Sequence, residues 1–363
     1  MKSSYKKEDV TFLLSDVSKL VKETPLEEKE RMLQAGRCYS EMLPEEYLPT
    51  EEYQKLFEDQ LKKTGMLIAS YVKILAEKLL QKYQTKTFVL ASLARAGVPI
   101  GILLKHYLEQ YCDCQVSHYA ISIIRGLGID TNALDTMVHS HDPKTIVFVD
   151  GWTGKGAIQK ELKEACDLYE KETGIHLDSE LAVLADTGHC TTLFGTREDF
   201  LIPSACLNST VSGLVSRTFY RSDIITGKMY HGEKYYDQFE SEDVSQHFLD
   251  EIEKHFPYIA VIPKTEYDPN VCCDFSGWAE TESVREHFNI HTINMVKPGV
   301  GETTRVLLRR VPWKILVKNP TDERLKHILM LAKDRGIPVE TYPLETYNCM
   351  GLIKKVDPKE QGV

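Results

Sequence analysis

A glycine-rich segment that follows an acidic residue at the end of an apolar run is the part of the sequence best suited to chemistry. Residues 145–157 read TIVFVDGWTGKGA, in which Asp150 ends the apolar run and three glycines and Lys155 follow. A turn of this kind between a strand and a helix presents backbone N–H groups, and the helix N-terminus adds partial positive charge. The segment therefore predicts a loop that binds a phosphate group, with Asp150 beside it to hold sugar hydroxyls.

Two common phosphate motifs do not fit this segment. The P-loop pattern GxxxxGK[ST] fails because Gly151 lies too close to Gly154-Lys155, and Gly156 stands where a Ser or Thr would reach magnesium. The dinucleotide pattern GxGxxG fails because Gln159 stands at the position of the third glycine. The acid directly at the end of the strand indicates a different kind of phosphate-binding site.

Two further segments carry charge next to glycine. Residues 89–101 read VLASLARAGVPIG, and the guanidinium of Arg95 would bind phosphate oxygens in pairs while Gly97 lets the backbone come close. Residues 118–134, with Arg125 among glycines, predict either a mobile lid over a substrate or an ordinary surface loop.

These segments together resemble the type I phosphoribosyltransferases, in which an apolar strand ends in acids and leads into a Thr-Gly loop. By this resemblance a 5-phosphate cradle is formed by Thr153, Gly154, Lys155, Gly156 and Ala157, and a pyrophosphate loop by Ala94, Arg95, Ala96 and Gly97. One departure is that Gly151 replaces the second acid usual in that family.

The order of the motifs is similar to a phosphoribosyltransferase family of bacterial tellurite-resistance and stress gene clusters, which has also been labelled cysteine protease StiP. The run IPSACLNSTVSGLVSRTF (202–219) is expected to form a family-specific hood. The resemblance implies that residues of the hood and one neighbouring acid face the base-like acceptor substrate. The acid is Asp186, and the hood residues are Ser204, Asn208, Ser212, Ser216 and Arg217. Asp186 could equally cap the end of its strand.

The resemblance implies a pentosyltransferase that uses phosphoribosyl pyrophosphate, with Mg²⁺ held mainly by the substrate, to make a nucleotide- or nucleoside-like metabolite in a stress pathway. Asp150, Arg95 and Arg125 would be its catalytic residues, and the base-like acceptor stays open. The tail resembles a Pelota-type RNA-binding domain, and its basic strip 305–318 predicts RNA contacts or a solvated face; the contact residues would be Arg305, Arg309, Arg310 and Lys314.

Two alternatives remain open. A cysteine protease needs a thiol with a histidine in reach, and the candidates are the neighbours His189 and Cys190, or Cys206 with one of several histidines. Those histidines are His118, His139, His141 and His231. The other alternative is a non-catalytic sensor that binds a phosphosugar and RNA, which the missing second acid at Gly151 would explain.

The elements that must position these residues alternate between strand and helix. Apolar runs at 87–93, 145–150 and 180–186, separated by helical periods, predict an α/β fold with a parallel sheet and helices on both faces. We expect a helical region at 1–84, a phosphoribosyltransferase-like domain with its hood at 85–240, a helical connector at 241–256, and a smaller αβα domain at 257–363. In the last domain, PYIAVIP (257–263) is predicted to be a strand.

The composition excludes several classes of protein. The net charge of −10 over 363 residues argues against a chain that coats nucleic acid throughout its length. No apolar run approaches the roughly 20 residues that a membrane-spanning helix needs. Nine scattered cysteines without a CxxC pair indicate reduced thiols rather than a disulfide framework or a zinc site. We expect a cytoplasmic protein without a membrane partner, and related transferases suggest a homodimer.

Overall fold

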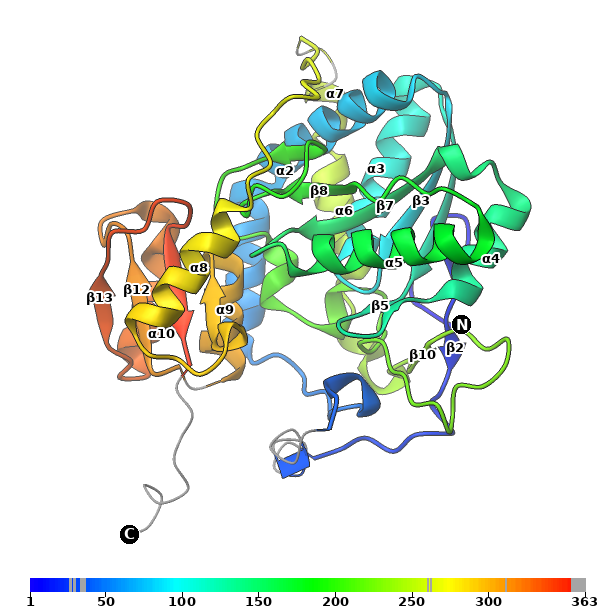
Figure 1. Ribbon diagram of the computed structural model, residues 1–363. Coiled ribbons are helices and arrows are strands. Elements are labelled where there is room, and N and C mark those ends of the chain that lie inside the picture. The colour runs from blue at the N-terminus through cyan, green and yellow to red at the C-terminus, as the bar shows by residue number, and fades with distance from the viewer. Residues whose placement is uncertain are drawn as a thin grey trace.

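The computed structural model shows an α/β fold with a smaller domain at the C-terminal end of the chain (Figure 1). It describes residues 1–353 except 26–27, 29–30, 33–36, 260, 262 and 311, and leaves out the side chain of Arg309. The larger part of the molecule surrounds a six-stranded sheet in which every neighbouring pair of strands is parallel. The predicted α/β class and the smaller second domain are therefore confirmed.

The strands of this sheet lie in an order that differs from their order in the chain. The sequence across the sheet is β1 (Thr11–Phe12), β4 (Gln115–Ile121), β3 (Thr87–Leu93), β7 (Ile146–Trp152), β8 (Leu181–Ala185) and β9 (Phe194–Thr196). Because β3 and β7 are neighbours and parallel, the segments that leave their carboxyl ends emerge side by side.

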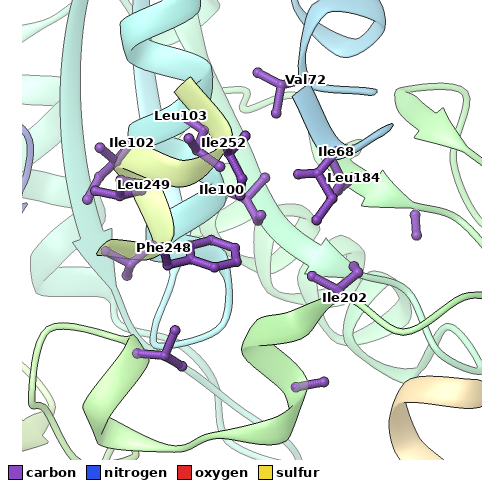
Figure 2. Close-up of a cluster of buried hydrophobic side chains, with 14 of the residues drawn as sticks. Ile68, Val72, Ile100, Ile102, Leu103, Leu184, Ile202, Phe248, Leu249 and Ile252 are labelled. Atoms are coloured by element: carbon purple, nitrogen blue, oxygen red, sulfur yellow. The ribbon is translucent and has the colours of Figure 1, made fainter. Parts of the chain in front are cut away.

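Both faces of the sheet are covered, because alternate residues of each central strand point to opposite sides. Leu90 and Val147 pack toward α2 (Glu51–Tyr83), α3 (Gly97–Cys112) and α6 (Ser245–Glu253). Figure 2 shows this side, where Ile100 of α3 and Leu249 of α6 belong to the same apolar cluster as Leu184 of β8. The next residues along, such as Val89 and Phe148, pack toward α4 (Thr131–Ser140) and α5 (Ala157–Thr173).

The N-terminal region differs from its prediction. The helix over Glu51–Tyr83 is confirmed, but residues 1–25 and 37–50 contain no α-helix. Instead β1 adds to the edge of the main sheet beside β4, and β2 (Ser15–Asp16) pairs with β10 (Gly232–Glu233). This segment therefore wraps the sheet edge and the predicted hood rather than forming a helical unit.

The expected hood contains little regular structure. It consists of short turns and the 3-10 helices η3 (Pro203–Cys206) and η4 (Ser209–Val211), and a further 3-10 helix, η5 (Asp237–Glu242), follows later in the chain. The helical connector that follows is present as α6. The strand predicted over 257–263 is wrong as far as the structure describes it, because the short helix α7 (Phe256–Ile259) occupies its first part.

The C-terminal domain has three layers around a four-stranded sheet. Its strand order is β11 (Val296–Pro298), β14 (Cys349–Leu352), β12 (Lys314–Val317) and β13 (Val339–Thr341). Helix α8 (Ser276–His287) packs on one face, and α9 (Val300–Arg309) and α10 (Lys326–Asp334) pack on the other. Val300 and Leu307 of α9 join the same buried cluster as residues of α2 and η3, so the two domains share one continuous core.

Candidate active site

The two predicted loops line two adjoining cavities at the same edge of the sheet. The pyrophosphate loop at 94–97 follows β3, and the segment at 150–157 follows β7, so both emerge at the same edge of the sheet. A cavity of about 690 Å³ is lined by Ala94, Arg95, Ala96 and Asp150. We call it the main cleft. A smaller cavity of about 180 Å³ adjoins it, is lined by residues 153–155 and shares Ala96 and Asp150 with the main cleft.

Arg95 is held by protein groups on several sides. Its guanidinium donates to the backbone oxygen of Val215 at 2.6 Å and to Oδ1 of Asn208 at 3.2 Å, and it lies 3.4 Å from the Glu46 carboxylate. Glu46 was missed by the sequence analysis because the N-terminal region was expected to be helical. These contacts use the N–H donors of Arg95 that a phosphate group would need. Because Asn208 and Val215 belong to the predicted hood, Arg95 connects the hood to the rim of the cleft.

Asp150 carries a carboxyl group that burial makes a weak acid. Burial raises the pKa of Asp150 to about 7, although the neighbouring Arg305 acts in the opposite direction. Its Oδ1 accepts a hydrogen bond from the backbone N–H of Gly151 at 2.7 Å. A carboxyl group with a pKa near neutrality can take up and release a proton under ordinary conditions, which suits a general base.

Asp150 should also make the stability of the protein depend on pH. Its pKa is higher in the folded protein than in the unfolded chain, so its contribution is present below about pH 4 and is lost as the pH rises to about 7. The gap between the two pKa values corresponds to at most about 4 kcal/mol. In urea titrations, Asp150→Asn should therefore show a smaller fall in the free energy of unfolding between these pH values than the wild type.

The exposed Asp223 supplies a control for this experiment. Its pKa is lowered by the hydrogen bond from Arg221, so it is already ionised throughout the range in question. Asp223→Asn should shift the free energy of unfolding by a constant amount. An Asp150→Asn curve parallel to the wild-type curve would contradict the assignment.

The predicted 5-phosphate loop is covered by the C-terminal domain. Nζ of Lys155 donates to the backbone oxygen of Ile293 at 2.9 Å, and the hydroxyl of Tyr347 donates to the backbone oxygen of Gly154 at 2.9 Å. Burial has the largest effect on Lys155, and together with the positive charges of the nearby Lys297 and Arg125 it lowers the pKa of Lys155 to about 7. Gly156 precedes α5, which begins at Ala157. This loop therefore forms part of the interface between the domains.

Asp186 caps the end of its strand, which is the second of the two roles left open for it. It is fully buried, and its carboxylate accepts hydrogen bonds from the N–H of Cys190 at 2.8 Å and the hydroxyl of Thr153 at 3.0 Å. It also lies 3.2 Å from Nε of Arg197. Burial raises the pKa of Asp186 to about 6. These bonds join the turn after β8 to the loop after β7.

Two of the predicted hood residues, Ser212 and Ser216, bond within the hood. The hydroxyl of Ser212 donates to the backbone oxygen of Asn208 at 2.7 Å, and that of Ser216 donates to the backbone oxygen of Arg217 at 2.7 Å. Ser204 lies in η3 and does not line the main cleft. Asn208 and Arg217 do line it, so the structure brings two of these residues to the cleft.

The predicted lid is a short hairpin followed by a helix. Strands β5 (Ile123–Ile124) and β6 (Gly128–Ile129) pair in antiparallel fashion, and Asp130 then caps α4. Arg125 lies in the turn, exposed, with its guanidinium 3.3 Å from Oδ1 of Asn294. Arg125 also lines the smaller cavity and is absent from the lining of the main cleft.

Three of the four histidines suggested as partners for Cys206 are bonded elsewhere. His118 contacts Ser92 and the backbone of Asp9, and both of its ring nitrogens are used. His141 bonds to Tyr119, and His231 bonds to Ser122. His139 lines a separate surface hollow. Among the residues that the structure describes as lining the main cleft, none is a histidine.

Cysteine, histidine and aspartate do meet at the turn after β8. His189 lies 4.0 Å from Asp274, and the sulfur of Cys273 lies 3.8 Å from Arg197. The neighbouring Cys190 is buried, and burial together with Asp186 raises its pKa to about 12. A thiol with so high a pKa holds its proton and is a poor nucleophile.

Cys206 is the cysteine of the main cleft. It ends η3, is buried like Cys190, and lines the cavity together with Leu207 and Asn208. Cys38 lines a different hollow, on the surface beside Arg221. The remaining cysteines of the first domain, which are Cys112, Cys114, Cys166 and Cys190, line neither cavity.

The residues predicted to contact RNA have different surroundings. Arg305 lines both the main cleft and the smaller cavity and is paired with Glu302 at 3.2 Å. Arg310 is exposed at the end of α9. Lys314 is paired with Glu340 at 2.6 Å. The side chain of Arg309 lies outside the described residues.

The described residues bear on two further predictions, the metal cofactor and the membrane. Within them, no group of three or more His, Cys, Asp or Glu residues could hold a metal ion. The sequence analysis predicted an Mg²⁺ ion held mainly by oxygens of the substrate. The side chains do not test this, so the ion stays a prediction. The helices of the described chain include none that is both long and apolar enough to cross a membrane.

Comparisons with known proteins match almost the whole chain. Residues 3–253 match a family model described as "Tellurite-like stress resistance cysteine protease StiP", and residues 275–355 match one described as "PELOTA RNA binding domain". A protein of Acinetobacter baylyi named "Cysteine protease StiP" is 34% identical, with 97% of this chain and 94% of that protein covered.

These findings confirm part of the sequence analysis and overturn another part. The likeness to the family labelled StiP and to a Pelota-type RNA-binding domain is confirmed. The prediction of a phosphoribosyltransferase that uses phosphoribosyl pyrophosphate is wrong, because both the family model and the relative are named as a cysteine protease. The physical reason for the error is that a glycine-rich turn after a strand also serves to seat another domain, as residues 154–155 do here.

Proposed function

This chain belongs to the StiP family of tellurite-like stress resistance cysteine proteases, and we propose that it is itself a cysteine protease whose nucleophile is Cys206. The observation that carries the choice of residue is the position of Cys206 in the main cleft. A cavity of about 690 Å³ is within the usual range for sites that enclose a substrate.

The surroundings of Cys206 supply groups with suitable roles. The thiol attacks a peptide carbonyl carbon, a C–S bond forms, and the C–N bond breaks with a proton passing to the leaving amine. Asp150 lines the same cleft and is the group that we assign to take the thiol proton, since its pKa is about 7. Water then hydrolyses the thioester.

Asn208 is the group that we assign to the carbonyl oxygen. Its Oδ1 is occupied by Arg95, which fixes the orientation of the side-chain amide. The NH₂ group at the other side of this amide is a donor that can stabilise the oxyanion of the tetrahedral intermediate.

A second function is favoured by a separate observation. The match of residues 275–355 to an RNA-binding domain supports RNA contact by the C-terminal domain, with Arg310 as an exposed cation at the end of α9.

Thiol alkylation tests the protease proposal. The full chain should cleave an unfolded protein such as reduced, alkylated casein, and prior treatment with iodoacetamide should abolish cleavage, because the thiolate is the attacking group. Chelators should leave cleavage unchanged. Cleavage that survives alkylation, or that is lost on adding EDTA, would overturn the proposal.

A further inference from the structure

We infer that the part of the main cleft next to α9 binds a phosphate group of single-stranded RNA, and that the guanidinium of Arg217 binds this phosphate. This inference goes beyond the proposed protease activity and does not depend on it. The RNA strand would pass from the C-terminal domain into the cleft, so that both domains contribute to one binding surface.

Arg217 is a cation that is held in place without an anionic partner among the described residues. Its guanidinium carbon lies 3.3 Å from the centre of the Tyr39 ring, so the group is stacked on the tyrosine. Its Nε is buried and has no hydrogen-bond partner among the described residues. No carboxylate in the described part of the chain forms an ion pair with it. A buried donor left unsatisfied is costly, so this guanidinium still needs an acceptor.

Two arginines of the C-terminal domain lie close enough to repel Arg217. Burial has the largest effect on Arg217, and together with the positive charges of Arg305 and Arg310 it lowers the pKa of Arg217 to about 9. Among the described residues, an acidic partner is found for Arg305 alone of these three arginines, and that partner is Glu302. The positive charges therefore outnumber the negative ones at this end of the cleft, and an anion placed among them would relieve the repulsion.

Arg95 provides a contrast within the same cavity. It is surrounded by Glu46, Asn208 and the backbone of Val215, which use its donors. Arg217 has none of these partners, although both residues line the main cleft. The geometry thus assigns ligand binding to Arg217 and a structural role to Arg95.

The rest of the cleft fits a nucleotide better than an acidic peptide. Tyr39, Tyr47 and Tyr53 line it, and Tyr47 is exposed. Nucleic-acid bases stack on aromatic rings and arginine planes, whereas carboxylate side chains gain little from them. Arg305 belongs to α9, within the segment that matches an RNA-binding domain. Arginine stacked on tyrosine, with a second arginine nearby, is a surface suited to single-stranded RNA.

Fluorescence anisotropy with labelled oligouridylate of about ten nucleotides tests the inference. The measurement uses the full chain carrying Cys206→Ser, so that the outcome does not depend on peptide cleavage. Arg217→Met should weaken RNA binding by at least about tenfold and make the dependence of affinity on salt less steep by about one phosphate contact. Arg217→Lys should be intermediate, since it keeps the charge and loses the planar fork. Adenosine monophosphate should compete with the RNA.

A matched control comes from the same part of the chain. Arg221 is bonded to Asp223 on both carboxylate oxygens, and Arg221→Met should bind RNA within about twofold of the parent protein. If Arg217→Met does not fold, as judged by circular dichroism, Arg305→Met tests the site from its other side and should weaken binding as well.

Three results would overturn the inference. Unchanged RNA affinity in both Arg217→Met and Arg305→Met would place RNA elsewhere on the protein. Binding of adenosine monophosphate through Arg217 without binding of RNA would make a free nucleotide the ligand. Binding of an oligoglutamate peptide through Arg217, with no RNA binding, would make the cleft selective for acidic peptides.

Discussion

Cys206→Ser is expected to lower kcat/KM for peptide hydrolysis by on the order of a thousandfold, because the hydroxyl is a much weaker nucleophile than the thiolate. The substitution exchanges the sulfur for an oxygen and nearly keeps the size of the side chain, so the cleft around Leu207 and Asn208 should keep its shape. A fluorogenic peptide assay measures the change, and an unchanged melting temperature would show that the fold is intact.

Cys190→Ser is the matched control for this experiment. Cys190 is a buried thiol in the same domain, next to His189, and its high pKa keeps it protonated. Its replacement should leave peptide hydrolysis within about threefold of the wild type. The reverse pattern, with activity lost in Cys190→Ser and kept in Cys206→Ser, would move the active site to the turn after β8.

Asp186→Ala is expected to lower the free energy of unfolding by about 3 kcal/mol, because it leaves several buried donors without an acceptor. The hydroxyl of Thr153 and the N–H of Cys190 both lose their acceptor, and Arg197 loses its ionic partner. Urea unfolding followed by circular dichroism measures the change at neutral pH. Asp186→Asn should be less damaging, because one acceptor oxygen remains.

An exposed ion pair supplies the comparison for Asp186. Asp223 pairs with Arg221 on the surface, and Asp223→Ala should leave the free energy of unfolding close to the wild-type value. Equal effects of Asp186→Ala and Asp223→Ala would contradict the view that Asp186 joins the loops after β7 and β8.

The sheet could be predicted from the sequence where its strands are buried on both faces. Strands β3, β7 and β8 are nearly continuous apolar runs, and the turn residues after them mark where each strand ends. Strands β1 and β2 are only two residues long, so no period reveals them. Their pairing depends on partners that are distant in the chain.

The contacts between the domains were beyond prediction from sequence. Lys155 binds the backbone of Ile293, and Asp199 accepts hydrogen bonds from the N–H groups of Val300 and Asn348. These partners are more than a hundred residues apart in the chain. A glycine-rich loop with a lysine looks the same in the sequence whether it seats a phosphate or another domain.

The candidate site was predicted better in its location than in its function. Residues 94–96 and Asp150 do line one cleft, as the strand ends indicated. The sequence analysis placed Arg95 on a ligand, whereas the structure shows it bonded to Glu46 and Asn208. One fold supports many activities, and the identity of the family decides between them here.

Covalent labelling with an electrophilic peptide is the most direct test of the proposed active site. A peptide that ends in a chloromethyl ketone should alkylate the protein once, and mass spectrometry of the digested protein should find the label on Cys206. Unlabelled substrate should slow the reaction. A label on Cys38, Cys190 or Cys273, or labelling that substrate does not slow, would contradict the account.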